Sequence, residues 1–332
     1  GAAAVTLLGV VGAGAAPRNS SWGAAAAQAP GTAKLVVRIS CWVGRFGNAV
    51  MQLGHAFLYA MVLGAKEVLV NGYANQGPDP KGMHEMLQLL PNFTPVAVHP
   101  RGIKRKRNWA CPKRLRPTAC FMYERCHGAA ASDYRTVLQN NIRPLLTRRL
   151  LSCAEDTQTN IDEGLLTVHV RSGDIWNPKF KGGFWHAWHQ LPCTMHEKII
   201  LEHGFKRILV VTDPSKHRRS PELTCLEAMA EKYALNLTVQ SKSLVEDFCT
   251  LLRARNFVLA YSSFSQAAAL LSTAIRRIFY RDWSDRTPGC GNYWLLEHRE
   301  ACHQLPGIAS FSYRAEFRSS NKSWLPAGDE YS

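Results

Sequence analysis

The chain has 332 residues, a length sufficient for two domains with sizeable hydrophobic cores. Its 40 Lys and Arg residues outnumber its 25 Asp and Glu residues, which gives a formal net charge of +15. Much of this excess lies in residues 101–116, and such a basic run attracts nucleic acids, heparin or other anions. No helix-turn-helix, zinc-finger or RNP motif accompanies the run, so we expect no nucleic-acid partner. We interpret it as a solvated loop that attracts an anionic glycan or a membrane surface.

Residues 1–16 are small and apolar, and the stretch is too short to span a bilayer comfortably. It is typical of a signal-peptide core or of the end of a membrane anchor, and a disordered leader is the alternative. Residues 17–33 are rich in Ser, Ala, Gly and Pro and have no hydrophobic periodicity. We therefore expect an apolar leader and linker over residues 1–33.

Residues 34–39 predict a short apolar strand, and a long helical pattern that ends at residue 63 follows it. Between them lies the sequence Gly44-Arg45-Phe46-Gly47-Asn48. The two glycines permit a tight turn from strand to helix, and Asn48 is a candidate N-cap. The loop has neither the full dinucleotide-binding glycine pattern nor the Gly-Lys-Ser/Thr of a P-loop. It predicts the first strand–turn–helix unit of a nucleotide-binding type of domain.

From residue 165 onward, short apolar runs alternate with helical patterns. The predicted strands cover residues 165–170, 207–212, 237–240, 257–261 and 277–281. The predicted helices cover residues 194–203, 221–233, 244–254 and 265–274. This alternation indicates βαβ units and a parallel sheet that is covered on both faces. The sequence thus predicts an α/β protein with two Rossmann-like domains that face each other across a cleft.

The first of these strands delivers two basic side chains to a sharp turn. His169 and Arg171 lie two residues apart and therefore share one face of the strand. The turn contains Gly173, which lets the backbone approach a ligand closely, and Asp174. A guanidinium suits a phosphate because its planar fork donates two parallel hydrogen bonds. The alternative is a strand that ends in a salt-bridged Arg–Asp turn without a ligand.

Two further strand-to-helix turns fall on the same predicted edge of the sheet. Asp213 follows the second strand, and the fourth strand ends in Ser262-Ser263-Phe264-Ser265. Serines at this position cap the helix that follows, and the same helix N-terminus attracts anions. Capping alone is the commoner use of such serines. Opposite Arg171, however, this turn favours phosphate binding.

Four motifs together resemble one family. The sequence from His169 to Asp174 is similar to the His-x-Arg-x-Gly-Asp motif of GDP-fucose-dependent fucosyltransferases. The glycine–asparagine loop at 44–48, the Thr-Asp at 212–213 and the Ser-Ser-Phe-Ser at 262–265 follow the order of that family. The likeness is strongest to the α1,2-fucosyltransferases, with the protein O-fucosyltransferases as close relatives. It implies a GT-B fold, an inverting mechanism and no metal requirement.

The resemblance also implies roles for individual residues. Arg171 would be the catalytic residue, contacting the donor diphosphate and stabilising the leaving GDP. The other donor-binding residues would be His169, Gly173, Asp174, Asp213, Ser262, Ser263, Phe264 and Ser265. The fucose and acceptor side of the site would be bordered by Arg45, Phe46, Gly47 and Asn48.

The residues themselves also argue for chemistry without a metal or cofactor. No Asp-x-Asp pair occurs that would hold a divalent ion against a diphosphate. A cationic side chain must then offset the charge that grows on the departing phosphate, and Arg171 fits this role. No general base can be assigned, because the candidates Asp79, His84, Glu85 and Asp133 lie in segments that we expect to be irregular. A loose, cation-like transition state at the fucose carbon needs little base strength.

The ten cysteines include no Cys-x-x-Cys, so we expect disulfides in an oxidising lumen rather than zinc sites. Four Asn-x-Ser/Thr sequons, at Asn19, Asn92, Asn236 and Asn321, also favour the secretory pathway, in the Golgi or endoplasmic reticulum.

We therefore expect a metal-independent fucosyltransferase that transfers fucose from GDP-fucose to a glycan or glycoprotein hydroxyl. The expected domains are an acceptor-side domain over residues 34–160 and a nucleotide-sugar domain over residues 161–318, followed by a polar tail over residues 319–332. Protein O-fucosylation and a non-catalytic basic module that binds carbohydrate or nucleic acid are the alternatives.

Overall fold

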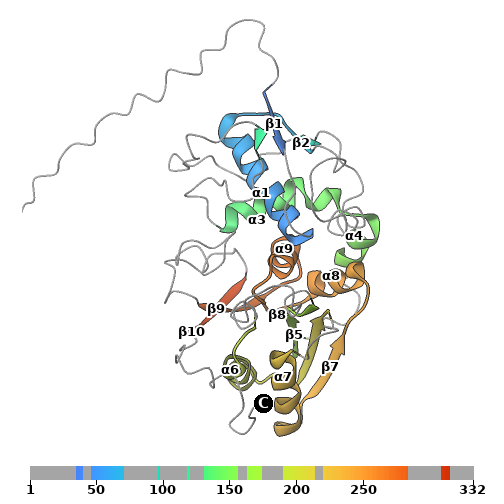
Figure 1. Ribbon diagram of the computed structural model, residues 1–332, viewed down its shortest axis with the longest axis vertical. Coiled ribbons are helices and arrows are strands. Elements are labelled where there is room, and N and C mark those ends of the chain that lie inside the picture. Colours follow the sequence, from blue (N-terminus) through green and yellow to red (C-terminus); the bar gives the residue numbers. More distant parts are fainter. Residues whose placement is uncertain are drawn as a thin grey trace, which may run out of the picture. The chain divides into compact units, whose positions relative to one another are not determined.

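The computed structural model describes residues 35–39, 46–70, 96–97, 118–119, 131–155, 163–173, 190–213, 220–282 and 308–314 (Figure 1). All of them belong to one compact unit, Leu35–Ser332. They form two β-sheets, both mainly parallel, with helices packed between and around the strands. The predicted α/β class, with two separate sheets, is therefore confirmed. The domain boundaries at residues 33, 160 and 318 stay predictions.

The first sheet has the strand order β3-β2-β1-β4. Its central strand β1 (Val36–Ile39) pairs in parallel with β2 (Glu67–Val70) and with β4 (Thr118–Ala119). The strand β3 (Val96–Ala97) pairs with β2 in the antiparallel direction. Helix α1 (Phe46–Leu63) connects β1 to β2, so the predicted strand–turn–helix unit is present.

Helix α1 is a core helix. From Phe46 to Ala60, every residue except Asn48 is buried, and a helix that is apolar on all sides is typical of the centre of a protein. Within the described ranges it is the one helix long and apolar enough to span a membrane, and 78% of its 18 residues are buried inside the protein. The helix begins at Phe46, so the prediction that Asn48 is its N-cap is wrong. The helix extends back because Phe46 is fully buried in the core.

Two further helices pack beside α1. Helix α3 (Ala131–Asn141) contacts both α1 and α9, and after the short 3-10 helix η2 (Arg143–Leu145) comes α4 (Arg148–Glu155), which contacts α8. The expectation that Asp133 lies in an irregular segment is wrong, because Asp133 lies in the first turn of α3. The buried Tyr134, Val137 and Leu138 recur at helical spacing and give this helix its apolar face. The candidates Asp79, His84 and Glu85 lie outside the described residues.

The second sheet has six strands in the order β10-β9-β8-β5-β6-β7, and every neighbouring pair is parallel. The strands are β5 (Leu165–Val170), β6 (Arg207–Thr212), β7 (Asn236–Gln240), β8 (Asn256–Val258), β9 (Arg277–Asp282) and β10 (Ala309–Arg314). Counted from β5, this order is 3-2-1-4-5-6, that of the doubly wound dinucleotide-binding sheet. The order reverses between β5 and β8, and we call this place the switch point.

The helices that connect these strands are α6 (Cys193–His203), α7 (Pro221–Lys232), α8 (Leu244–Arg253) and α9 (Ser263–Leu271). Of these helices, α7 and α8 start at the predicted residues, α6 starts one residue earlier than predicted and α9 two residues earlier. Serine side chains cap α7, α8 and α9 through Ser220, Ser243 and Ser262. Strand β8 ends at Val258, three residues earlier than predicted. The sixth strand, β10, was not predicted; its Phe311 stacks on Phe279 of β9 with ring centroids 5.1 Å apart.

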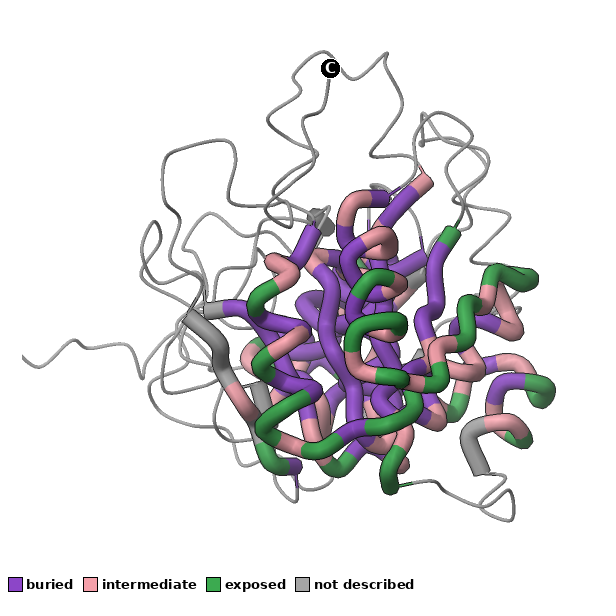
Figure 2. Tube along the Cα trace, turned by 90° about the horizontal axis from the view of Figure 1, so that it is seen from below, coloured by how far each residue is buried: buried purple, intermediate pink, exposed green. Residues whose placement is uncertain are grey.

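Two hydrophobic clusters hold these elements together. The larger cluster combines α1, α3, α8 and α9, so it joins elements from both halves of the chain. The smaller cluster lies between the second sheet and the helices α6 and α7. Figure 2 shows the result, with buried positions following the strands and exposed positions on the outer turns of the helices. Helix α9 lies beside α1 and α8, at the meeting point of both halves (Figure 1).

Two disulfides confirm the predicted use of cysteines within the described part of the chain. Cys153 of α4 pairs with Cys249 of α8, and Cys193 of α6 pairs with Cys225 of α7. The other six cysteines lie outside the described residues. Disulfides of this kind are consistent with residence in the secretory pathway, where they form and persist.

We expect the Cys153–Cys249 disulfide to contribute strongly to stability, because it closes a loop across a sequence separation of 96 residues. Replacing both cysteines by Ser should lower the free energy of unfolding by about 2–5 kcal/mol, the range typical of long loops. Denaturant unfolding under non-reducing conditions measures this change. A loss below about 1 kcal/mol would mean that the packing of α4 on α8 holds these helices together without the covalent bond.

Candidate active site at the switch point

The candidate site residues gather at the carboxyl ends of β5, β6 and β8. Parallel strands all end at the same edge of the sheet, and at a switch point the neighbouring connections diverge and leave room for a ligand. Arg171 directly follows β5, Asp213 directly follows β6, and the serine turn lies between β8 and α9. The sequence therefore correctly placed these three turns on one edge.

Arg171 connects the two strands at the switch point. Its Nη1 atom donates a hydrogen bond of 3.2 Å to the main-chain oxygen of Tyr261. Tyr261 lies three residues after the end of β8 and directly before Ser262, the N-cap of α9. The Arg171 side chain is half-buried. The hydrogen bond therefore holds a permanently charged guanidinium beside the N-terminus of α9, while part of it stays accessible.

His169 is buried beneath this arginine. Its ring packs against Phe264 of α9, with ring centroids 5.7 Å apart. Burial, and to a smaller degree the charge of Arg171, lower the pKa of His169 to about 3. The imidazole is therefore neutral at physiological pH. Its Nδ1 atom is buried and has no hydrogen-bond partner among the residues that the structure describes.

The turn after β5 packs closely against the end of β6. Gly173 has a φ of +64°, in the left-handed region that glycine adopts at low cost. A Cβ atom at this position would lie 2.5 Å from Oδ2 of Asp213. Gly173 is therefore required both for the backbone conformation and for the close approach of the Asp213 carboxylate. The pKa of the nearby Asp247 is raised, mainly by its burial and in part by the charge of Asp213.

The three serines of the turn between β8 and α9 differ in burial and in hydrogen bonding. Ser262 caps α9, because its Oγ accepts a hydrogen bond of 3.2 Å from the main-chain N–H of Phe264. Ser265 is fully buried, and its hydroxyl donates to the main-chain oxygens of Ala260 and Ser262. Ser263 is half-buried at the first position of the helix. The capping interpretation therefore holds for Ser262, while the Ser265 hydroxyl stabilises the turn through hydrogen bonds to its main chain.

The first turn of α1 lies directly on the first turn of α9. A Cβ atom at Gly47 would lie 2.4 Å from both the main-chain nitrogen of Phe264 and the carbonyl carbon of Ser263. No side chain fits between the two helices here. The contact brings the glycine–asparagine loop of the N-terminal half to the switch point of the second sheet.

An aromatic cluster of Phe46, Phe248 and Phe264 surrounds this contact. The ring centroids of Phe46 and Phe248 are 4.9 Å apart, and those of Phe248 and Phe264 are 5.1 Å apart. Aromatic pairs of this geometry each contribute about 0.5–1.5 kcal/mol beyond the area that they bury. Phe264 also packs on His169, so the aromatic cluster connects α1 to the strand that carries Arg171.

Arg45 and Asp174, two of the predicted site residues, lie outside the described residues. Asn48 is half-buried in the first turn of α1, next to the contact of Gly47 with α9. Sequence analysis missed Gln190, whose side chain holds the main chain of Arg171, because a single Gln in a loop carries no sequence signal. Within the described ranges, no group of three or more His, Cys, Asp or Glu side chains could hold a metal ion.

No protein-family model matches the chain, and no curated protein matches its sequence. Among solved structures, POFUT1 in complex with GDP shares 12% identity over 75% of this chain and 99% of its own, with a TM-score of 0.42. The fucosyltransferase NodZ from Bradyrhizobium shares 13% identity over 73% of this chain and 94% of its own, with a TM-score of 0.40. NodZ α1,6-fucosyltransferase soaked with GDP-fucose shares 15% identity over 76% and 97%, with a TM-score of 0.39. At these values the functional assignment depends on the residues of the chain itself.

Gly47→Ala should separate α1 from α9, because the new methyl group would collide with main-chain atoms that cannot rotate away. Overpacking of this kind costs about 1–3 kcal/mol in unfolding free energy. Gly54→Ala on the same helix is the matched control, since its Cβ would meet side-chain atoms instead of main chain, namely Leu138 at 3.3 Å and Tyr134 at 3.6 Å. Ala is the better helix former, so the control should be neutral or more stable. Equal stabilities of the two variants would contradict the contact described here.

The low pKa of His169 should make the protein less stable in acid. Below about pH 6.5 the unfolded chain binds a proton at this residue, whereas the folded protein resists protonation down to a pKa of about 3. Stability should therefore fall with pH by up to roughly 1.4 kcal/mol per unit across this window. Denaturant unfolding from pH 7 to pH 4 would show a shallower fall for His169→Asn, which does not titrate. Parallel curves for the two proteins would show that His169 titrates normally in the fold.

Proposed function

We propose that the chain is an inverting fucosyltransferase that transfers fucose from GDP-fucose to a hydroxyl group of a glycan. The observation that carries the proposal is the place of Arg171, the charged residue of the His-x-Arg-x-Gly-Asp sequence. It stands at the switch point of a sheet with dinucleotide-binding strand order, and it is hydrogen-bonded beside the N-terminus of α9. A cation and a helix N-terminus on one ligand-binding edge together suit a diphosphate.

The donor diphosphate would lie between Arg171 and the first turn of α9. The main-chain N–H groups at the start of a helix have no partner within the helix and carry the positive end of its dipole. The half-buried Arg171 guanidinium would donate hydrogen bonds to the phosphate oxygens. Ser263, half-buried at the start of α9, is placed to add a hydroxyl donor.

Asp213 supports the nucleoside part of the proposal. In doubly wound sheets an acidic residue at the end of the second strand accepts hydrogen bonds from the ribose hydroxyls. Asp213 ends the strand that occupies this place, and its carboxylate lies over Gly173 at the turn of the first strand. It would bind the guanosine, while the neutral His169 and Phe264 form the apolar wall beneath it.

In the transfer step, the acceptor oxygen would form a bond to the anomeric carbon of fucose while the bond from that carbon to the GDP oxygen breaks. The attack comes from the face opposite the leaving group, so the configuration inverts. Negative charge grows on the diphosphate, where Arg171 and the α9 amides would stabilise it without a metal ion. The hydroxyl proton leaves to solvent late in the step, because a cation-like fucose carbon demands only a weak nucleophile. Phe46, Gly47 and Asn48 would border the acceptor side.

GDP should therefore bind and stabilise the protein in the presence of EDTA. At a hundred times its dissociation constant, a ligand adds about 2.7 kcal/mol of stability, which is a clear shift in melting temperature. UDP should give a much smaller shift. A larger shift with UDP, or a shift that requires Mn²⁺, would contradict the donor proposal.

Arg171→Lys should reduce transfer by about tenfold to a thousandfold, because Lys keeps the charge and loses the two-pronged donor geometry. Arg171→Ala should lose at least as much activity. Transfer from radiolabelled GDP-fucose measures the effect, and circular dichroism checks that each variant is folded. Near-normal turnover in either variant would remove Arg171 from the mechanism.

The acceptor class separates an α1,2-like enzyme from a protein O-fucosyltransferase. The Ser263-Phe264-Ser265 turn resembles that of the α1,2 enzymes, so a free β-galactoside should accept fucose. Small disulfide-rich protein domains serve as the competing acceptors in the same assay. Transfer to these domains alone would favour protein O-fucosylation, and binding of a glycan without any fucosyl transfer would favour the non-catalytic module. We place the enzyme in the Golgi or endoplasmic reticulum lumen, and the disulfides support this.

A further inference from the structure

A chain of buried polar side chains lies directly behind Arg171. Gln190, which is almost fully buried, donates a hydrogen bond from Nε2 to the main-chain oxygen of Arg171. Its Oε1 accepts hydrogen bonds from the hydroxyl of Ser220 and, at 3.3 Å, from the main-chain N–H of Glu222. The amide orientation of Gln190 is defined by these partners, because a main-chain N–H can only donate and a carbonyl oxygen can only accept.

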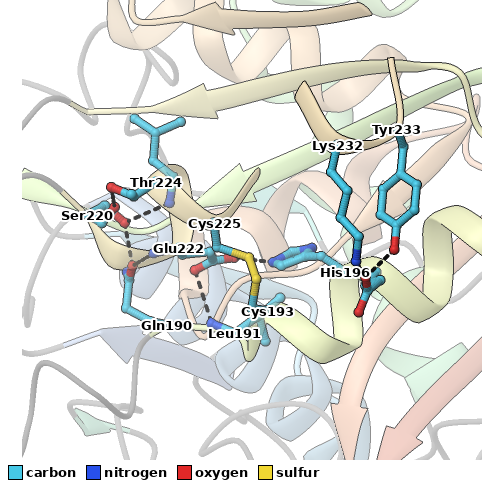
Figure 3. The surroundings of a disulfide bond; sticks show 12 residues. Gln190, Leu191, Cys193, His196, Ser220, Glu222, Thr224, Cys225, Lys232 and Tyr233 are labelled. Carbon is cyan, nitrogen blue, oxygen red and sulfur yellow. Dashed lines mark hydrogen bonds and ion pairs between the residues drawn. A yellow bond between two sulfur atoms is a disulfide. The ribbon is translucent and has the colours of Figure 1, made fainter. Parts of the chain in front are cut away.

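The next members of the chain are also buried. The carboxylate of Glu222 accepts from the main-chain N–H of Leu191 at 3.0 Å and pairs with Nε2 of His196 at 2.8 Å. The side chains of Glu222 and His196 are fully buried, and burial raises the pKa of Glu222. The Cys193–Cys225 disulfide joins the first residue of α6 to the fifth residue of α7 beside this pair (Figure 3). We call Gln190, Ser220, Glu222 and His196 the Gln190 network.

The Gln190 network acts where the sheet ends. The pairing of β5 with β6 stops at Val170 and Thr212, and its pairing with β8 stops at Val168. Arg171 is thus the first residue beyond the ladder, and the hydrogen bond to its carbonyl comes from the Gln190 side chain instead of a strand. Without this partner the Arg171 main-chain oxygen would lose this hydrogen bond, and the turn would be held less firmly.

We propose that Gln190 is a positioning residue for Arg171, and that Ser220, Glu222 and His196 fix Gln190 in turn. The network holds the Arg171 main chain so that the guanidinium points along the edge of the switch point, towards Tyr261 and α9. Small errors in the direction of a charged donor are costly in catalysis, since the developing charge is stabilised only at short range. This inference rests on the proposed role of Arg171 in binding the donor diphosphate.

Gln190→Met tests the inference, because Met keeps the length of the side chain and removes all three hydrogen bonds. We expect kcat for fucosyl transfer to fall at least tenfold, with weaker GDP binding. Glu197→Gln is the matched control. Glu197 of α6 accepts hydrogen bonds from Lys232 and Tyr233 at the end of α7, so its loss should lower the melting temperature without changing kcat.

A double-mutant cycle distinguishes positioning from a general loss of stability. If Gln190 acts through Arg171, the Gln190→Met substitution should have almost no further effect on transfer in the Arg171→Ala background. Full additivity of the two effects would overturn the inference, and so would unchanged kinetics of Gln190→Met. Failure of the wild-type protein to bind GDP would instead overturn the proposed function.

Ser220 provides a second test that does not depend on the folding of Gln190→Met. Ser220→Ala removes the hydroxyl donor to Gln190, whereas Ser220→Thr keeps it together with the cap of α7. We expect Ala to reduce kcat and Thr to restore it. Equal kcat in the Ala and Thr variants would show that Ser220 serves only as a helix cap.

An independent observation concerns Asn236, the first residue of β7. Asn236-Leu237-Thr238 is an N-glycosylation sequon, and both Asn236 and Thr238 are exposed while Leu237 packs towards the core. β7 is the outermost strand of its sheet, paired with β6 alone among the described strands. An edge strand with an exposed Val239 is a template for unwanted strand pairing, which a bulky polar group prevents.

We infer that Asn236 carries an N-linked glycan that covers the β7 edge. In this modification the side-chain nitrogen of Asn236 displaces the diphosphate of a polyprenyl-diphosphate-linked oligosaccharide, forming an N-glycosidic bond and losing one proton. The alternation along β7 points the nitrogen of Asn236 and the hydroxyl of Thr238 to the same solvent-facing side. The inference does not depend on the catalytic activity.

The test is peptide mapping of the protein secreted from human cells behind a cleavable signal peptide. Release of the glycan by peptide N-glycosidase in H₂¹⁸O should leave labelled Asp at position 236. Thr238→Ser keeps the sequon and should keep the label, whereas Thr238→Ala should lose it and increase self-association in light scattering. An unlabelled Asn236 in the secreted wild-type protein would overturn the inference.

Discussion

The main-chain contact between Gly47 and the Ser263–Phe264 peptide is the constraint on which the arrangement of the site depends. It lets the first turn of α1 touch the first turn of α9 without an intervening side chain. The aromatic rings of Phe46, Phe248 and Phe264 fill the space around this point, and His169 continues the packing to β5. Elements from both halves of the chain therefore meet at the carboxyl edge of the second sheet, where the charged groups lie.

The site combines a cation with an uncharged support. Arg171 stays charged, while the buried His169 beneath it stays neutral because of the low dielectric surroundings and the neighbouring guanidinium. A second positive charge below Arg171 would repel the guanidinium. On the other side of the main chain, the Gln190 network supplies hydrogen bonds without adding a charge next to the guanidinium. The result is one strongly directed donor at a place where the sheet leaves room for a ligand.

The fold of the C-terminal half could be predicted because local and tertiary signals agree there. Apolar runs of strand length alternate there with helical patterns, and this alternation by itself indicates a parallel sheet. Serines that cap the helices, Ser220, Ser243 and Ser262, mark where the helices begin. The edge strand β10 was not predicted because its sequence, Ala-Ser-Phe-Ser-Tyr-Arg, contains no continuous apolar run. The sequence predicts Asn48 as the N-cap because the local pattern does not show that Phe46 is buried in the core and belongs to the first turn of α1.

The site was predictable only as far as it lies in strand-end motifs. Arg171, Gly173 and Asp213 follow apolar runs directly, so their common edge follows from the topology of parallel strands. Gln190 and Tyr261 contribute through a side-chain amide and a main-chain carbonyl whose partners lie far away in sequence, and such contacts leave no local pattern. The close approach of Gly47 to α9 is likewise a long-range contact that the sequence does not predict, because two glycines in a turn are compatible with many neighbours.

The central claim is that a guanosine diphosphate binds at the switch point between Arg171 and α9. A crystal structure of the protein grown with GDP tests this most directly. The account predicts diphosphate oxygens within hydrogen-bond distance of the Arg171 guanidinium and of the main-chain N–H groups at the start of α9, with the guanosine near Asp213. GDP bound elsewhere, or a diphosphate that does not contact Arg171, would contradict the account.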